Sequence, residues 1–111
     1  MGHKTTSYQQ DLINSLKDPL EAAAYLNAAI EEGDRSVFLL ALRNVAEAHG
    51  GMGVLAERSH LSRENLYRML SQQGNPEIKS LYALLQAMGL RLAIEPKDRN
   101  TAEFDHQPSQ L

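Results

Sequence analysis

Helix-stop signals recur along the chain and divide it into short helical segments. Asp18 followed by Pro19 begins one of them, because Asp can accept a hydrogen bond from a free first-turn amide and Pro fits the first helical position. Glycines end the segments, since a glycine readily takes the left-handed conformation that follows a helix. These glycines are Gly33, Gly50, Gly51 and Gly89. The chain is therefore expected to fold as a set of short helices packed on one another.

The segments on either side of Gly33 predict two helices, each with one buried apolar stripe. The second of them is capped by Asp34 or Ser36. The expected stripe of the first helix is Leu20, Ala23, Ala24, Leu26 or Asn27, and Ile30. The expected stripe of the second is Val37, Leu40, Ala41, Val45 and Ala48. Helices are also predicted over residues 8–16 and 78–89.

The composition fits one domain with a modest core. Of the 111 residues 42% are hydrophobic and 23% charged, which predicts one soluble domain with tails. Without Cys or Trp, and with only two Phe, the core must be built from Leu, Ala, Ile, Val and Met. No apolar run approaches a membrane span and no signal peptide is evident, so a cytoplasmic protein is expected. Because the net charge is -3, any nucleic-acid surface must be local.

In the stretch ERSHLSRENLYRML, residues 57–70, one apolar repeat stops at His60 and another begins just after Ser62, so only a short turn separates them. It predicts a short helix over residues 52–59 and a second over residues 62–70. A helix, a tight turn and a second helix form the helix-turn-helix arrangement, whose second helix enters the major groove of DNA. The side chains predicted to pack inside this pair are Leu55, Ala56, Leu61, Leu66, Met69 and Leu70.

The second helix of the pair carries side chains suited to reading base edges. An Arg can pair two donors with guanine, an Asn can bridge two atoms of adenine, and a Glu can accept from cytosine. A Ser at the helix start is a good N-cap, and hydroxyl groups can bind phosphate. The candidate DNA-binding residues are Ser62, Arg63, Glu64, Asn65, Tyr67 and Arg68. The alternative is a solvated face, in which Glu64 and Arg68 form an i,i+4 pair.

No catalytic, metal or cofactor site is predicted. Glu57, Ser59 and His60 are neighbours on one short helix and its turn, so they cannot converge around a substrate. The His residues lack metal-ligand spacing, and no glycine-rich phosphate loop is present. The chain is therefore expected not to be an enzyme, and no cofactor is implied.

Residues 90–95, LRLAIE, alternate apolar and other side chains in the period-two pattern of a half-buried strand. A lone strand has no ladder partner in its own chain, so its free amides and carbonyls favour the same strand of a second copy, or a partner's sheet. We expect antiparallel pairing across a two-fold axis, with Leu90, Leu92 and Ile94 at the dimer interface. Leu92 and Ile94 would then be buried against the preceding helix. The polar residues 96–111 are predicted to be disordered.

Residues 55–90 resemble the Xre/Cro-type helix-turn-helix domain, with LAERSHLSRENLYRML as the paired helices and IKSLYALLQAMGL as the next core helix. The phrases DPLEAAAYLNAAIEEGD, FLLALRNVAEAHGGMGVLAE and LSRENLYRMLSQQGNPEIKSLYALLQAMGLRL resemble, in order and spacing, the addiction-module antidote proteins of bacterial type II toxin-antitoxin systems. More narrowly, they are similar to HigA-like antitoxins. The resemblance implies an all-α domain of five to six helices over residues 18–95, with one short C-terminal β-strand. Residues 1–17 would be a partly helical N-terminal extension.

The resemblance also implies a function. Such an antitoxin neutralises a RelE-fold, HigB-type mRNA-cleaving toxin and represses its own operon as a homodimer on operator DNA. Two positions depart from the pattern. His60 stands where the turn usually has Gly, so the backbone must tolerate a left-handed residue or turn differently. Met52 replaces a Gln that caps the bracing helix against phosphate in many relatives. The alternatives are a stand-alone Xre-type repressor, and a protein-interaction module whose helix-turn-helix is vestigial.

The toxin is predicted to bind the N-terminal part, residues 8–32. With DNA assigned to the reading helix and the dimer to the strand, the N-terminal apolar stripe is left without a role. Acidic residues in the same part suit a basic, RNA-cleaving toxin. The predicted anchors are Tyr8, Leu12, Leu16, Leu20 and Tyr25. Two alternatives remain: the stripe packs only on the protein's own core, or the C-terminal tail binds the toxin through Phe104.

Overall fold

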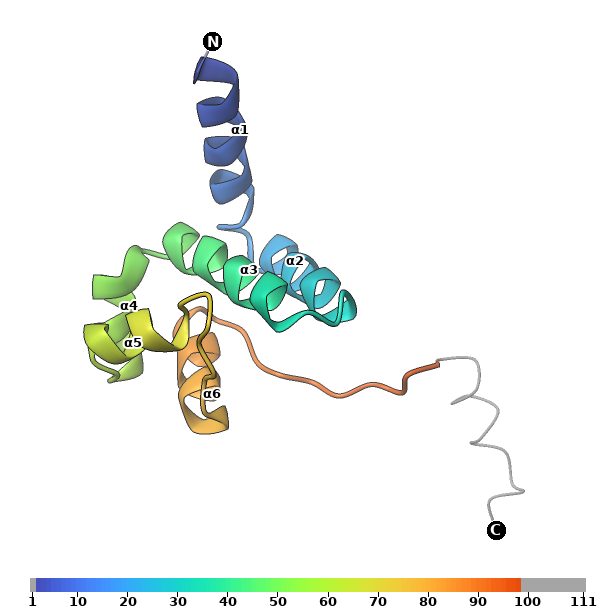
Figure 1. The fold of residues 1–111 in the computed structure, drawn as a ribbon, viewed down its shortest axis with the longest axis vertical. Helices are drawn as coiled ribbons and strands as arrows, with labels where there is room; N and C mark the ends of the chain where they lie inside the picture. Colours follow the sequence, from blue (N-terminus) through green and yellow to red (C-terminus); the bar gives the residue numbers. More distant parts are fainter. Residues whose placement is uncertain (1, 99–111) are drawn as a thin grey trace.

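The structure, a computed structural model, describes the backbone of residues 2–98 and the side chains of residues 8–98, and this part of the chain is all-α, as predicted (Figure 1). Its elements are α1 (Gly2–Ser15), α2 (Pro19–Glu31), α3 (Arg35–Ala48), α4 (Gly51–Ser59), α5 (Arg63–Met69) and α6 (Ile78–Ala87). The predicted pair of short helices is present as α4 and α5. The N-terminal helix begins earlier than the expected residue 8.

Local capping explains where α2 and α3 begin. An Asp18 carboxylate oxygen accepts from the backbone N–H of Leu20 at 3.0 Å, and an Asp34 oxygen accepts from that of Ser36 at 2.9 Å. Both contacts satisfy first-turn amides that have no partner inside the helix. Gly50, with φ 116°, follows the end of α3 in a conformation that glycine adopts readily. These predicted helix boundaries are confirmed.

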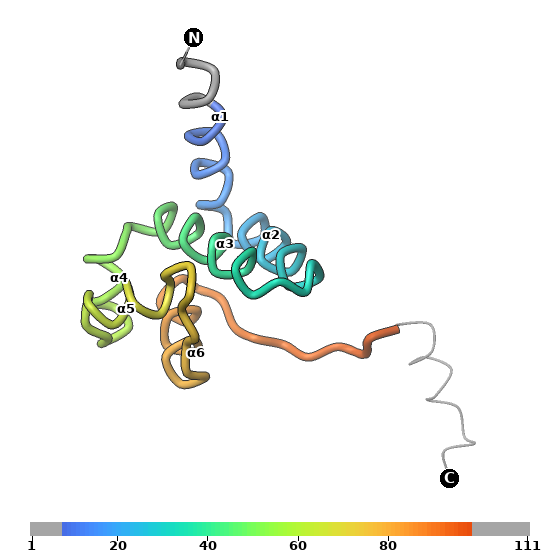
Figure 2. The backbone as a smooth tube through the Cα atoms, viewed as in Figure 1, coloured from blue at the N-terminus to red at the C-terminus, as the bar shows by residue number. Residues whose placement is uncertain are grey.

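The helix α3 lies at the centre of the arrangement. It packs against α1, α2 and α4, and α4 in turn packs against α5 and α6. Figure 2 shows α2 and α3 as an antiparallel pair, with α4 and α5 beyond the end of α3 that lies opposite the α2–α3 turn. The α4–α5 pair and the α2–α3 turn therefore occupy opposite ends of the fold.

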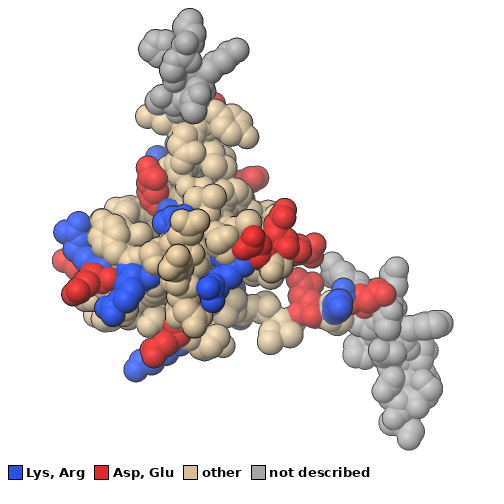
Figure 3. Space-filling model, viewed as in Figure 1, with Lys and Arg blue, Asp and Glu red and all other residues tan. Residues whose placement is uncertain are grey.

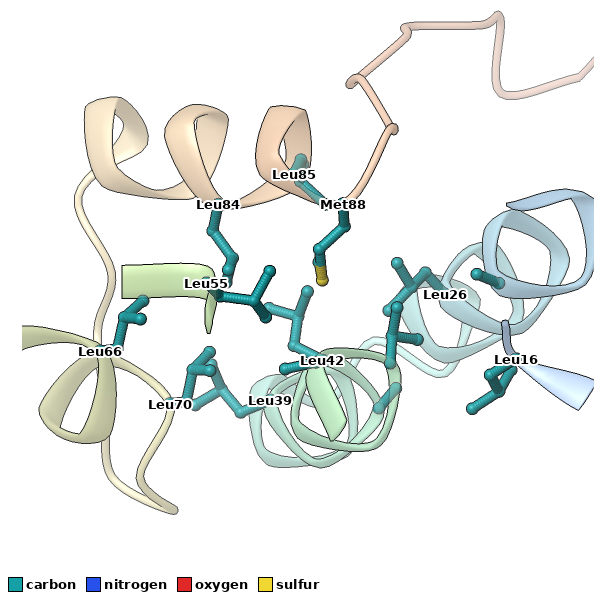
Figure 4. Close-up of a cluster of buried hydrophobic side chains, with 14 of the residues drawn as sticks. Leu16, Leu26, Leu39, Leu42, Leu55, Leu66, Leu70, Leu84, Leu85 and Met88 are labelled. Carbon is teal, nitrogen blue, oxygen red and sulfur yellow. The ribbon is translucent and has the colours of Figure 1, made fainter. Parts of the chain in front are cut away.

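Leucines from five segments meet in one core (Figure 4). Leu39 and Leu42 of α3 contribute from one side, and Leu55, Leu66 and Leu84 come from α4, α5 and α6; all five are completely buried. At about 1.5–3 kcal/mol for each fully buried Leu, this cluster is the main attraction that holds the short helices together. The remaining large, fully buried side chains are Leu16, Leu70 and Val45.

The predicted apolar stripe of α2 is confirmed at Leu26 and wrong at both of its ends. The buried residues of α2 are Ala22, Leu26 and Ala29, whereas Leu20 is 81% and Ile30 is 48% exposed. Alanines occur around most of this helix, so its apolar periodicity fits several faces equally well. The α3 stripe needs a similar correction. Leu40 is exposed, and the buried residues are Leu39, Ala41, Leu42, Val45 and Ala46.

No β-strand forms in the part of the chain that the structure describes. Residues 90–96 leave α6 as an extended segment without regular structure, because the described chain offers them no ladder partner. Leu90 is half-buried, but Leu92 is 39% and Ile94 is 98% exposed, so the burial expected at a dimer interface is not present in one chain. Of the predicted disordered tail, residues 99–111 lie outside the described residues.

Candidate nucleic-acid interface

The N-terminus of α5 is capped as the sequence predicts. The Ser62 hydroxyl accepts a hydrogen bond from the backbone N–H of Asn65 at 3.0 Å, and Ser62 itself has an extended conformation. Because α5 is one of the shortest helices and could not persist alone in water, this cap and its packing must hold it in place. Leu66 and Met69 are buried beneath it, which fixes the face that it turns outward.

The predicted DNA-binding residues lie together on and before α5. Arg63, Glu64, Tyr67 and Arg68 are exposed, and Asn65 is half-buried. Asn65 and Arg68 line a groove between α5 and the loop that leads to α6. Arg63 lies in a second groove, against Gly53 and the outer side of α4. The outward face of α5 thus presents two cations, one carboxylate, one phenol and a half-buried amide.

The turn between α4 and α5 contains a left-handed His60. Its φ is 64°, a conformation that costs a residue with a Cβ roughly 1–2 kcal/mol. Two neighbours hold the turn: the buried Ser59 hydroxyl accepts from the backbone N–H of Leu61 at 3.3 Å, and the Leu61 side chain packs on the core. His60 therefore adopts the left-handed conformation, one of the two outcomes expected where the resemblance leads us to expect a Gly. Met52 is half-buried against the core, so an apolar group occupies the position of the capping Gln expected from the resemblance.

Arg43 holds the C-terminal end of α5, a role that the sequence did not reveal. Its guanidinium donates to the backbone carbonyl of Leu70, the C-cap residue of α5. A cation at this end also interacts favourably with the partial negative charge of the helix terminus. Arg43 belongs to α3, and no sequence pattern identifies a backbone acceptor so far along the chain.

The loop after α5 packs closely on the same helix end. A Cβ at Gly74 would lie 2.2 Å from the Met69 carbonyl oxygen, so only glycine fits there. Gly74 is buried, and its N–H donates to the Ser71 carbonyl at 2.8 Å. Ser62, Arg43 and Gly74 together fix α5 at both ends.

Charge is distributed unevenly over the molecule. Figure 3 shows Asp and Glu side chains gathered over the α2–α3 turn, whereas Lys and Arg side chains are interspersed with acidic ones over α4 and α5. A polyanion is therefore repelled least at the end that carries α5.

The predicted toxin anchors do not form one exposed surface. Leu16 is only 2% exposed, and His49 Nε2 lies 2.9 Å from the Leu16 carbonyl oxygen, so this residue attaches the end of α1 to the body. Its prediction as an anchor is corrected, because a partner cannot reach it. Tyr25 is half-buried, and its hydroxyl accepts from Asn44 at 2.8 Å. Leu12 is half-buried as well, whereas Tyr8 and Leu20 are exposed.

Comparison with known families identifies the chain. A family profile described as "probable addiction module antidote protein" matches residues 6–96, which include α2 to α6 and the extended segment. The chain belongs to this antidote family. An uncharacterized protein of Haemophilus influenzae is 31% identical over 85 residues, which cover 77% of this chain and 87% of that relative. No solved structure matches significantly.

Membership in the antidote family indicates an antitoxin role and a toxin partner. Among residues 2–98, none of the antidote's helices is long and apolar enough to cross a membrane. The same described residues contain no group of three His, Asp or Glu side chains placed to hold a metal ion.

Proposed function

We propose that this antidote protein neutralises a RelE-fold, HigB-type mRNA-cleaving toxin and represses its own operon by binding operator DNA through α5. The observation that carries the DNA-binding part is the fixed α5 with Arg63 and Arg68 turned outward. In this reading α4 and α5 form a helix-turn-helix of the Xre type, with α4 bracing the reading helix.

The chemistry of α5 suits a major groove. Arg63 and Arg68 can each pair two donors with guanine or bind phosphate, and Asn65 can bridge adenine. Tyr67 and Ser62 add hydroxyl groups for the backbone. Glu64 is the weakest member of the set, because a carboxylate is favourable only against a cytosine amino group and is repelled by phosphates elsewhere.

A homodimer would place two copies of α5 on a palindromic operator, one on each half-site. Helix-turn-helix repressors bind half-sites about one turn of DNA apart as two-fold dimers. The extended segment 90–96 supports such a dimer, because its backbone edge has no ladder in one chain and Ile94 is almost fully exposed. Antiparallel pairing of two segments would satisfy these groups and cover Leu92 and Ile94.

A gel-shift experiment on the DNA upstream of the gene tests the DNA-binding proposal. The double variant Arg63→Ala, Arg68→Ala should lose about 1–3 kcal/mol of operator binding for each base contact removed. The control is Arg35→Ala, Lys97→Ala, which removes the same charge from exposed positions outside α5 and outside the proposed pairing segment 90–96. Equal affinity of both double variants at moderate salt would contradict the assignment of α5 and favour an interaction module with a vestigial helix-turn-helix. Operator binding without any toxin encoded nearby would favour a stand-alone repressor.

A further inference from the structure

One face of α2 is exposed in the part of the chain that the structure describes. The helix packs on α3 through its small buried residues, and the opposite stripe, with Leu20, Ala24 and Glu31, is exposed. Leu20 and Ile30 place large apolar side chains in solvent near the two ends of this one helix. A single exposed Leu is ordinary, but this helix exposes two large apolar side chains, and one of them, Ile30, borders an apolar hollow that no described residue fills.

The hollow lies between α2 and the extended segment that follows α6. It has a volume of about 120 Å³, and its walls include Arg91 and Glu95 as well as apolar side chains. The apolar lining consists of Ala23, Leu26, Ile30, Phe38, Leu85, Leu90, Leu92 and Ala93. Because an apolar cavity of about 150 Å³ can hold benzene, this space suits one Leu, Met or Phe side chain from a partner.

The charge around α2 indicates which kind of partner would bind this face. Residues 18–34 contain five acidic residues and no Lys or Arg, whereas residues 35–98 contain eight Lys or Arg and six Asp or Glu. Three of the acidic residues, Glu31, Glu32 and Asp34, are exposed around the turn that follows Ile30 (Figure 3). A basic protein surface is attracted to such a rim, and nucleic acid is repelled.

We propose that the outer face of α2 is the toxin-docking surface, and that it receives a basic segment whose large apolar side chain enters the hollow beside Ile30. This inference rests on the proposed antitoxin function and specifies the site of contact. It narrows the predicted toxin site, residues 8–32, to the exposed residues of α2, and it retains Leu20 as an anchor while leaving out the buried Leu16.

A second copy of the chain is the poorer occupant of this face. A two-fold symmetric contact uses the same surface patch of both copies, so Glu31 and Glu32 of one copy would face the equally acidic α2 region of the other, which has no Lys or Arg between residues 18 and 34. Like charges opposed in this way disfavour association. The proposed dimer uses the backbone edge of residues 90–96, which also form one wall of the hollow, and it leaves Leu20, Ile30 and Glu31 of α2 exposed.

Binding of the full-length protein to the small protein encoded by the adjacent reading frame tests the proposal, with isothermal calorimetry as the readout. Ile30→Lys should weaken binding by about tenfold or more, because it adds a like charge at the mouth of the hollow and removes apolar contact. The matched control is Ile78→Lys, since Ile78 is an isoleucine of similar exposure on α6. The double variant Glu31→Lys, Glu32→Lys should slow association with the toxin and reduce the salt dependence of that association. Its control is the double variant Glu57→Lys, Glu77→Lys, which makes the same charge change at exposed positions outside α2.

Each result has a distinct meaning. Near wild-type affinity of Ile30→Lys would overturn the docking site while leaving the antitoxin function intact. A change of oligomeric state in Ile30→Lys with full toxin binding would overturn it in favour of a second copy. Failure of the wild-type protein itself to bind would overturn both the proposed function and this site. If Ile30→Lys loses the circular dichroism signal of a helical protein, Leu20→Lys is measured in its place, because Leu20 is more exposed. The same loss of toxin binding is expected for Leu20→Lys.

Discussion

Replacing Arg43 by Met removes the contact that holds the C-terminal end of α5 while keeping a long side chain. The guanidinium donates to the carbonyl of Leu70, whose own side chain is completely buried. The substitution leaves this carbonyl without its charged donor next to the core. We expect lower stability and a less well positioned α5.

The structure sets the magnitude. A hydrogen bond to a charged group contributes about 1.5–3 kcal/mol. Because Arg43 is half-buried, water can replace part of the contact, so we expect a loss of about 1–2 kcal/mol. In a domain of this size each kcal/mol lowers the melting temperature by about 4–8 °C. A comparable loss of positioning would reduce operator affinity by about tenfold, since 1.4 kcal/mol corresponds to that factor.

Thermal unfolding and a salt series of DNA binding provide the assay. Arg35→Met is the control, because it removes the same charge from an exposed position at the start of α3. Operator affinity should fall in Arg43→Met, while affinity for unrelated DNA and the slope of affinity against salt stay unchanged, because Arg43 itself neutralises no phosphate. Arg43→Lys, which retains one donor, should recover part of both losses.

Two results would refute this reasoning. A melting temperature equal to that of the control would show that the contact does not stabilise the fold. A salt slope reduced by about one would show instead that Arg43 binds phosphate directly.

Three further predictions follow from separate contacts. Gly74→Ala should lower stability by about 1–3 kcal/mol in thermal unfolding, since the new Cβ must displace the Met69 carbonyl; unchanged stability would contradict the close packing. Leu92→Pro removes a backbone donor from the proposed pairing edge and should convert a dimer into a monomer by light scattering, whereas a persistent dimer would place the interface elsewhere. Hydrogen bonds from the Ser36 side chain and backbone lower the pKa of Asp34 from its ordinary value of 3.8. The ionised Asp34 therefore stabilises the folded protein above pH 3.8, and this contribution is lost as the pH falls through the lowered pKa. The difference in melting temperature between wild type and Asp34→Ala should therefore shrink in acid, and a constant difference would exclude a charge effect.

Features that depend on a few neighbouring residues were predictable from the sequence. The caps Asp18, Asp34 and Ser62 each bond an amide two or three residues away, so their identity and position suffice. The inner face of α5 was also predicted, because Leu66 lies between polar neighbours that leave one apolar face, and Leu55 of α4 is completely buried as expected.

Features that depend on distant partners were not predictable in this way. The alanine-rich α2 could turn several faces to α3, and only the folded chain shows that Ala22 and Ala29 are buried while Leu20 is not. The Arg43 contact joins a side chain to a backbone carbonyl of another helix, which no residue pattern reports. The strand over residues 90–95 needs a partner that one chain does not contain.

The separation of the acidic α2–α3 turn from α5 gives the molecule an electric dipole along its fold. In the field of a polyanion, a torque on this dipole turns the acidic end away and brings the end with α5 forward before contact. The number of unproductive collisions then falls although the net charge is -3. If α5 binds operator DNA as proposed, a protein that DNA repels as a whole can in this way still arrive with α5 first.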